Sequence, residues 1–117
     1  MARRRRKTYH HGDLRNALLK AAIPVLARKG VAGLSLREVA AAAGVSHAAP
    51  YRHFRDKAGL LEAIAVQGHN SLRDGCLAAQ QQWPQDPKRQ WVETGLNYLR
   101  FTLENPEIAQ VMFGSVV

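Results

Sequence analysis

The side chains best able to do chemistry in this sequence are basic, and most of them lie in its first half. Residues 1–57 contain 13 Lys and Arg against 3 Asp and Glu, whereas residues 58–117 contain 4 against 6. The first half therefore carries a charge of +10 and the second half −2, in keeping with the net +8 of the chain. A surface of this kind attracts phosphate groups quickly and with strong salt dependence. The pattern indicates a polyanionic partner, although a solvated basic surface with a disordered tail is the simpler alternative.

Histidine and cysteine, the usual residues of metal sites and nucleophilic catalysis, are few and unsuitably spaced for either. The five histidines are His10, His11, His47, His53 and His69, and the only thiol belongs to Cys76. The sequence contains no HExxH or CxxC motif, no Gly-rich phosphate loop and no GxSxG turn. We therefore predict that the protein is not an enzyme and has no metal site and no cofactor.

The single cysteine also bears on the compartment. One thiol cannot form an internal disulfide framework, and its presence fits a reducing environment. Met1 leads directly into a basic run, without an apolar stretch of the length that a signal peptide or membrane span needs. We expect a cytoplasmic protein without membrane insertion.

The clearest structural motif lies just before the middle of the chain. Ser35 followed by Glu38 is a capping box, which starts a helix, and apolar residues then recur at helical spacing. Gly44 is placed to end that helix, because glycine adopts the left-handed turn at little cost. Ser46 is a favourable N-cap for a second, short helix over residues 47–54. Helix, glycine turn and capped short helix together predict a helix-turn-helix.

The same stretch carries a family resemblance. The run from Ala40 to Leu61 reads AxxxGVSxxxxYRHFxDKxxLL and resembles the DNA-binding domain of TetR-type transcriptional regulators, with a match that extends over roughly residues 11–64. Pro50 departs from the pattern, since the family usually has Leu there. Its missing N–H costs least near a helix start, so we expect a slightly distorted second helix rather than a lost one.

The resemblance implies an all-α fold with a three-helix DNA-binding domain, followed by an incomplete helical effector and dimerisation domain. It also implies a sequence-specific transcriptional regulator, most often a repressor, that binds a palindromic operator in double-stranded DNA as a homodimer. A small-molecule effector of unknown identity would release the DNA. The alternative is a truncated basic helical module that binds nucleic acid without sequence preference.

The residues expected to contact DNA lie on and around the second helix of the motif. They are Ser46, His47, Ala48, Ala49, Tyr51 and Arg52. An alanine methyl can touch a thymine methyl, but these small side chains offer few hydrogen bonds to bases. Arg37, on the preceding helix, is therefore the better candidate for a bidentate guanine contact, and the resemblance points to the same position.

Further residues are expected to contact the DNA backbone. The resemblance assigns Tyr51, His53 and Lys57 to phosphates, and it brings His11 and Arg15 near the backbone. The basic run consists of Arg3, Arg4, Arg5, Arg6 and Lys7. It has no apolar partner, so it should be disordered in the free protein and either lie on phosphates, reach a minor groove or serve only as a solubilising leader.

The remaining pattern divides the chain into a basic arm at 1–11, a DNA-binding domain at 12–56 and a partial effector domain at 57–117. The first helix is expected over 12–29, with a kink or one loosened turn at Pro24 and an end at Gly30. Later helices are expected over 57–81, over 88–103 and from Pro106 onward, with a polar, proline-broken loop at 80–87.

The last residues, VMFGSVV, are apolar and uncapped. We expect the chain to be shortened relative to the family. Apolar side chains such as Trp91, Leu96, Phe101 and Phe113 would then lack cover, which favours self-association or poor solubility.

Overall fold

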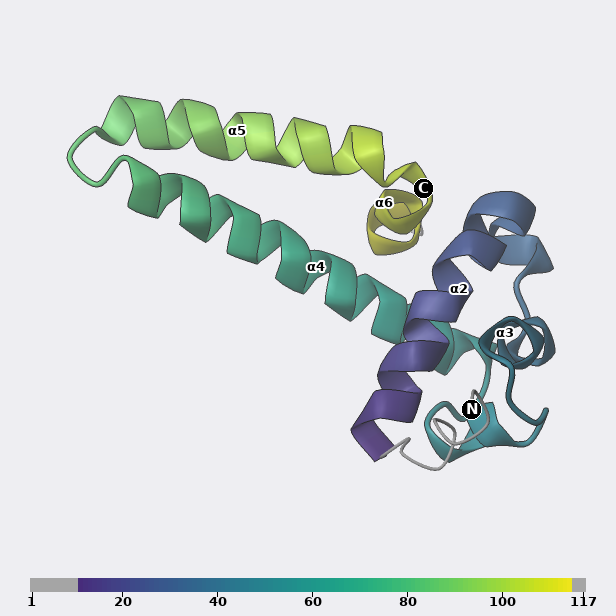
Figure 1. Ribbon diagram of the computed structural model, residues 1–117. Helices are drawn as coiled ribbons and strands as arrows, with labels where there is room; N and C mark the ends of the chain where they lie inside the picture. Colours follow the sequence, from purple (N-terminus) through teal and green to yellow (C-terminus); the bar gives the residue numbers. More distant parts are fainter. Residues whose placement is uncertain (1–10, 115–117) are drawn as a thin grey trace. The chain divides into compact units, whose positions relative to one another are not determined.

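The computed structural model describes the backbone of residues 11–114 and the side chains of residues 13–114. This part of the chain consists of helices joined by short turns and contains no strand (Figure 1). Its elements are α2 (His11–Gly33), α3 (Leu36–Ala43), the 3₁₀ helix η1 (Ala49–Arg52), α4 (Lys57–Gln82), α5 (Pro87–Glu104) and α6 (Pro106–Phe113). The prediction of an all-α fold is confirmed.

The chain forms two compact units, one up to Leu61 and one from Glu62 onward. The sequence places the boundary before Lys57, at the start of α4. The chain instead divides within α4, between Leu61 and Glu62.

The first unit is built on the apolar stripe of α2. Its buried side chains are Leu18, Leu19, Ala22, Val25, Leu26, Leu34, Leu36, Val39, Ala40, Ala49, Pro50, Phe54 and Leu60. They recur at helical spacing in α2 and α3, so each helix turns one face inward. At about 1.5–3 kcal/mol for each large side chain, this burial is the main force that holds the motif together.

The expected end of the first helix is found at Gly30. Its φ of 74° and ψ of 177° interrupt the helical backbone, and a further short turn continues to Gly33. Gly30 is the only residue of α2 with non-helical angles, so the expected kink at Pro24 is not where the helix breaks. Pro24 lies on the exposed face, where water can satisfy the carbonyl left unbonded by its ring.

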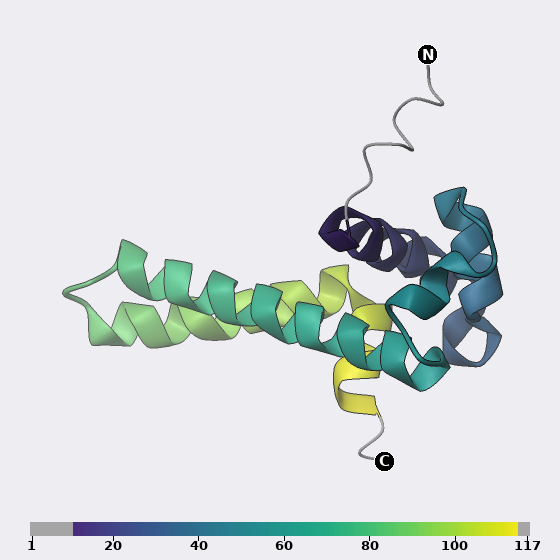
Figure 2. The same ribbon diagram turned by 90° about the horizontal axis from the view of Figure 1, so that it is seen from below.

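The second unit contains the rest of α4 with α5 and α6. In Figure 1 and Figure 2, α5 runs back beside α4, and α6 turns away from the axis of α5. Gly68 of α4 allows α6 to approach closely, because a Cβ at this position would lie 2.6 Å from the sulfur of Met112. His69 and Phe113 meet edge to face, with 5.4 Å between ring centroids.

The loop between α4 and α5 is shorter than expected. Gln80, Gln81 and Gln82 are helical, since glutamine has a good helix propensity and nothing breaks the chain before Trp83-Pro84. Asp86 caps α5, with its Oδ1 accepting from the backbone N–H of Arg89 at 3.0 Å. No helix among residues 11–114 is both long and apolar enough to cross a membrane.

Candidate nucleic-acid interface

The first helix of the motif is set by its two ends. Ser35 Oγ accepts from the backbone N–H of Glu38 at 3.1 Å, as the capping box predicts. The carboxylate of Glu38 forms an ion pair with Lys29 Nζ at 2.5 Å. In place of the second hydrogen bond of a capping box, the Glu38 side chain makes this ion pair, which links the end of α2 to the first turn of α3.

The turn after α3 has the geometry that the sequence predicts. Gly44 has φ 74° and ψ 31°, which is the left-handed conformation, and its N–H bonds back to the α3 carbonyls. The N–H of Val45 follows with a 3.0 Å bond to the carbonyl of Ala40. This pattern closes α3 and redirects the chain toward the second helix.

The second helix differs from the expectation over residues 47–54. Only Ala49–Arg52 is helical, and it is a 3₁₀ helix capped by Ala48 without a side-chain hydrogen bond, so Ser46 is not its N-cap. Pro50 explains the change, because it has no N–H to donate to the carbonyl of Ser46. The chain instead uses shorter-range bonds, from Ala49 N to Ser46 O at 3.1 Å and from Tyr51 N to Ala48 O at 3.2 Å.

The side chains of this segment divide into an exposed and a buried set. Ser46, His47, Ala48, Tyr51 and Arg52 are exposed, and 61% of Tyr51 is accessible. Ala49 is only 6% exposed, so its methyl packs inside the unit and we leave it out of the proposed DNA-contacting set. Pro50 is buried beside it, so the first two residues of η1 face inward while Tyr51 and Arg52 face the solvent.

Arg15, near the start of α2, lies against Phe54, which follows η1. Its guanidinium carbon lies 5.4 Å from the ring centroid of Phe54, a cation–π contact that joins the start of α2 to the residues after η1. Phe54 is 3% exposed and belongs to the core, as expected from its apolar character. His53 beside it is half-buried. The contact places Arg15 beside the predicted phosphate-binding residues.

Lys57 begins α4 but its ammonium group is already engaged. Nζ donates to the carbonyl of Ala32 at 3.2 Å, which ties the start of α4 to the bend between α2 and α3. Asp56 caps α4, with Oδ1 accepting from the N–H of Gly59 at 2.9 Å. An ammonium group has three donors, so the bond to Ala32 leaves capacity for a phosphate.

A hollow of about 550 Å³ lies on the surface between α2, α3 and the following turn. We call it the α2–α3 hollow, and its lining residues are Arg28, Arg37, Glu38, Ala41, Ala42 and His47. The structure thus brings together Arg37 and His47, both predicted from sequence. It adds Arg28, which the sequence patterns did not single out because it reads as one more exposed basic residue of α2.

Some predicted contacts lie outside the described residues. These are Arg3, Arg4, Arg5, Arg6 and Lys7, together with the side chain of His11. Between residues 11 and 61 alone, 8 Lys and Arg face 3 Asp and Glu, so this unit is basic without the arm. Among the described residues, no group of three His, Cys, Asp or Glu side chains is arranged to hold a metal ion.

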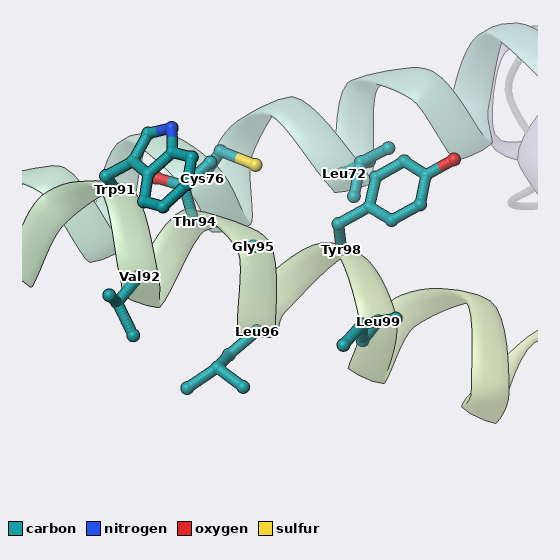
Figure 3. Close-up of a pocket in the computed structure, with 9 residues that line it drawn as sticks. All are labelled: Leu72, Cys76, Trp91, Val92, Thr94, Gly95, Leu96, Tyr98 and Leu99. Carbon is teal, nitrogen blue, oxygen red and sulfur yellow. The ribbon is translucent and has the colours of Figure 1, made fainter.

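The second unit has a groove of about 620 Å³ along α4 and α5. Its lining residues are Leu72, Cys76, Trp91, Val92, Thr94, Gly95, Leu96, Tyr98 and Leu99 (Figure 3). Most are apolar, and Trp91 is 81% exposed. Asn97 fixes the two helices locally, with Nδ2 donating to the carbonyl of Leu72 and to Cys76 Sγ, both at 3.4 Å.

Comparison with known proteins gives a consistent picture for the first unit. Residues 18–64 match the family model described as "Bacterial regulatory proteins, tetR family". The HTH-type transcriptional regulator AcrR of Shigella flexneri is 35% identical over 75 residues, which are 64% of this chain and 35% of AcrR. The tetracycline repressor protein class A from transposon 1721 of Escherichia coli is 44% identical over 50 residues, or 43% of this chain and 23% of the repressor.

Solved structures extend the likeness into the second unit. A protein of unknown function from Rhodococcus sp. RHA1 superimposes with a TM-score of 0.79 at 40% identity, over 92% of this chain and 55% of that protein. A regulatory protein in the tetR family from Rhodococcus RHA1 gives 0.72 at 31% identity, over 85% and 52%. The chain thus spans about half the length of these structures, and about a third or less of the curated relatives. Residues 18–64, which contain the helix-turn-helix, thus match the N-terminal domain of the tetR family of bacterial regulatory proteins.

Proposed function

We propose that the protein is a sequence-specific DNA-binding transcriptional regulator. The observation that carries the proposal is the Gly44 turn, which is followed by exposed polar and basic side chains on a unit with a strong positive charge. A short helical segment on such a turn can enter a major groove about 12 Å wide. The similar proteins AcrR and the tetracycline repressor are named as a transcriptional regulator and a repressor, which supports the same function.

We assign different roles to the two ends of the motif. Arg37 is exposed on α3, and its planar guanidinium can bond a guanine edge with two donors. Tyr51 within the 3₁₀ turn, and His53 and Lys57 after it, serve as backbone contacts. Because η1 is a single turn with small neighbouring side chains, direct base readout rests mainly on Arg37 and His47.

The proposed regulator acts as a repressor on a palindromic operator, bound as a homodimer. Two recognition segments must then lie about 34–36 Å apart, or a multiple of that distance, to meet successive major grooves. On α5, Val92, Leu96, Leu99 and Leu103 recur at spacings of four, three and four, and each is 42% exposed or more. This is the spacing of a helix-pairing seam, which supports association with a second copy.

We propose the groove of α4 and α5 as the effector site. Leu72, Cys76 and Trp91 of its lining fit a small apolar or aromatic molecule, with Thr94 and the Tyr98 hydroxyl as available polar groups (Figure 3). Val92, Leu96 and Leu99, which also line the groove, are assigned to the helix-pairing seam and not to the effector. An effector that binds one arrangement of α4 better than another would shift DNA affinity by a coupling of about 1–3 kcal/mol.

The test is selection of duplexes from a randomised pool, followed by fluorescence anisotropy on the selected sequence. A specific regulator prefers its palindrome over a shuffled duplex by about 10³-fold or more at physiological salt. A binding curve that depends steeply on salt but not on sequence would instead support the non-specific basic module. Light scattering of the free and DNA-bound protein tests the dimer in the same samples.

A further inference from the structure

Arg28 has no role in the helix-turn-helix as described so far, although its position is distinctive. It lies in the last regular turn of α2, two residues before the break at Gly30, and its side chain is exposed. It shares the α2–α3 hollow with Arg37 and His47, which come from α3 and the turn after it. Three segments of the first unit thus bring basic side chains to one place on the surface.

The hollow is more positive than its lining residues alone suggest. Glu38 is the only acidic residue in its lining, and the carboxylate of Glu38 is bound to Lys29 Nζ at 2.5 Å. Lys29 points to this carboxylate from the residue next to Arg28. Lys29 therefore neutralises the one carboxylate in the lining. The guanidinium groups of Arg28 and Arg37 remain available to bind a different anion.

We propose that the α2–α3 hollow binds a backbone phosphate of the DNA, with Arg28 as the principal contact. The inference rests on the proposed function and deepens it. A guanidinium group binds a phosphate through two parallel N–H···O bonds, and two guanidinium groups beside one hollow favour a group that carries a full negative charge. Arg37 can then bond a base edge while Arg28 holds the adjoining strand, so the two arginines divide positioning and readout.

The experiment compares four proteins by fluorescence anisotropy on a specific duplex and on a shuffled duplex. They are the wild type, Arg28→Ala, Arg28→Lys and Lys20→Ala. Lys20 is the matched control, because it is an exposed cation of the same helix and does not line the hollow. Affinity is measured over a series of salt concentrations, and thermal unfolding by circular dichroism verifies that each variant folds.

Arg28→Ala should weaken binding to both duplexes by the same factor, about five- to tenfold, and lower the salt slope by about one. Arg28→Lys should retain the salt slope but recover only part of the affinity, since an ammonium group cannot form the bidentate contact. Lys20→Ala should change affinity by less than about twofold, because it neutralises a charge outside the contact.

Several results would overturn the inference. Equal losses for Arg28→Ala and Lys20→Ala would show that only general charge matters. A loss confined to the specific duplex would make Arg28 a base contact. A titration with inorganic phosphate at matched ionic strength tests whether the hollow binds a free anion instead of DNA. A shift of the Arg28 side-chain NMR signal at millimolar phosphate would assign the hollow to free phosphate.

The failure of this inference is distinguishable from failure of the proposed function. If Arg28→Ala binds as the wild type does while the wild type still prefers its own duplex, the phosphate site is wrong and the regulator remains. If the wild type shows no preference for any duplex, the proposed function itself fails.

Discussion

Replacing Gly44 with Ala tests the turn on which the helix-turn-helix depends. Gly44 has φ 74° and ψ 31°, and a Cβ built there meets no atom within 4 Å. The cost is therefore conformational rather than steric. A residue with a Cβ loses about 1–2 kcal/mol in the left-handed region, and alanine regains about 0.4–1 kcal/mol because its unfolded state is less flexible. We expect a net destabilisation of about 1 kcal/mol.

The matched control is Gly59→Ala in the same unit. Gly59 lies in the first turn of α4, where a Cβ would make only an ordinary contact, 3.6 Å from Asp56 Oδ1. Alanine is favoured over glycine in a helix by up to about 1 kcal/mol, so this variant should be more stable than the wild type. The same chemical change thus has opposite signs at the two sites.

Urea unfolding followed by circular dichroism measures both variants. The midpoint should fall for Gly44→Ala and rise for Gly59→Ala, with unchanged slopes. If both midpoints move in the same direction by similar amounts, Gly44 does not hold a left-handed turn in solution, and the reasoning is refuted.

Three further substitutions test the capping, core and contact assignments. Ser35→Ala removes the 3.1 Å cap of α3 and should cost about 1 kcal/mol in urea unfolding; no loss would mean that the cap is absent in solution. Phe54→Ala should cost about 3–5 kcal/mol, because the ring is 3% exposed, and a surface-like loss below about 1 kcal/mol would contradict its place in the core. Arg37→Ala should cost about 1–3 kcal/mol at one guanine and relax discrimination there, whereas Lys57→Ala should weaken all duplexes alike. Identical effects of these two variants on every duplex in the anisotropy assay would show that their roles are misassigned.

The fold could largely be predicted because its signals are local. Ser35, Gly44 and Asp56 each act on backbone groups a few residues away, so their effects follow from sequence spacing. The limits of α4, α5 and α6 were predicted within a few residues for the same reason. The expected helix over 57–81 and the expected loop over 80–87 overlap at Gln80 and Gln81, and both residues are helical, as is Gln82, in keeping with the helix propensity of glutamine.

The second helix of the motif shows where sequence reasoning reached its limit. A distorted helix was expected at Pro50, but the extent of the change depends on which hydrogen bonds replace the missing one. The structure resolves this with bonds of the 3₁₀ type, which shorten the helix to Ala49–Arg52 and bury Ala49. The direction of each side chain therefore could not be read from α-helical spacing.

The candidate site could be predicted in part. The exposed positions of Arg37, His47, Tyr51 and Arg52 agree with their expected roles, although their contacts with DNA remain predictions. Arg28 could not be found from sequence, since only the fold brings it beside Arg37. Sequence spacing also does not predict the hydrogen bond from Lys57 to the carbonyl of Ala32 or the ion pair between Lys29 and Glu38, because both join separate elements.

The most direct test of the account is competition between duplexes for the purified protein. Labelled DNA selected from a randomised pool is displaced by unlabelled selected DNA or by a shuffled duplex of equal composition, at about 0.15 M salt. We predict that the shuffled duplex is needed at about a thousandfold higher concentration or more. Equal displacement by both duplexes would contradict the central claim that the Gly44 turn presents a sequence-reading surface.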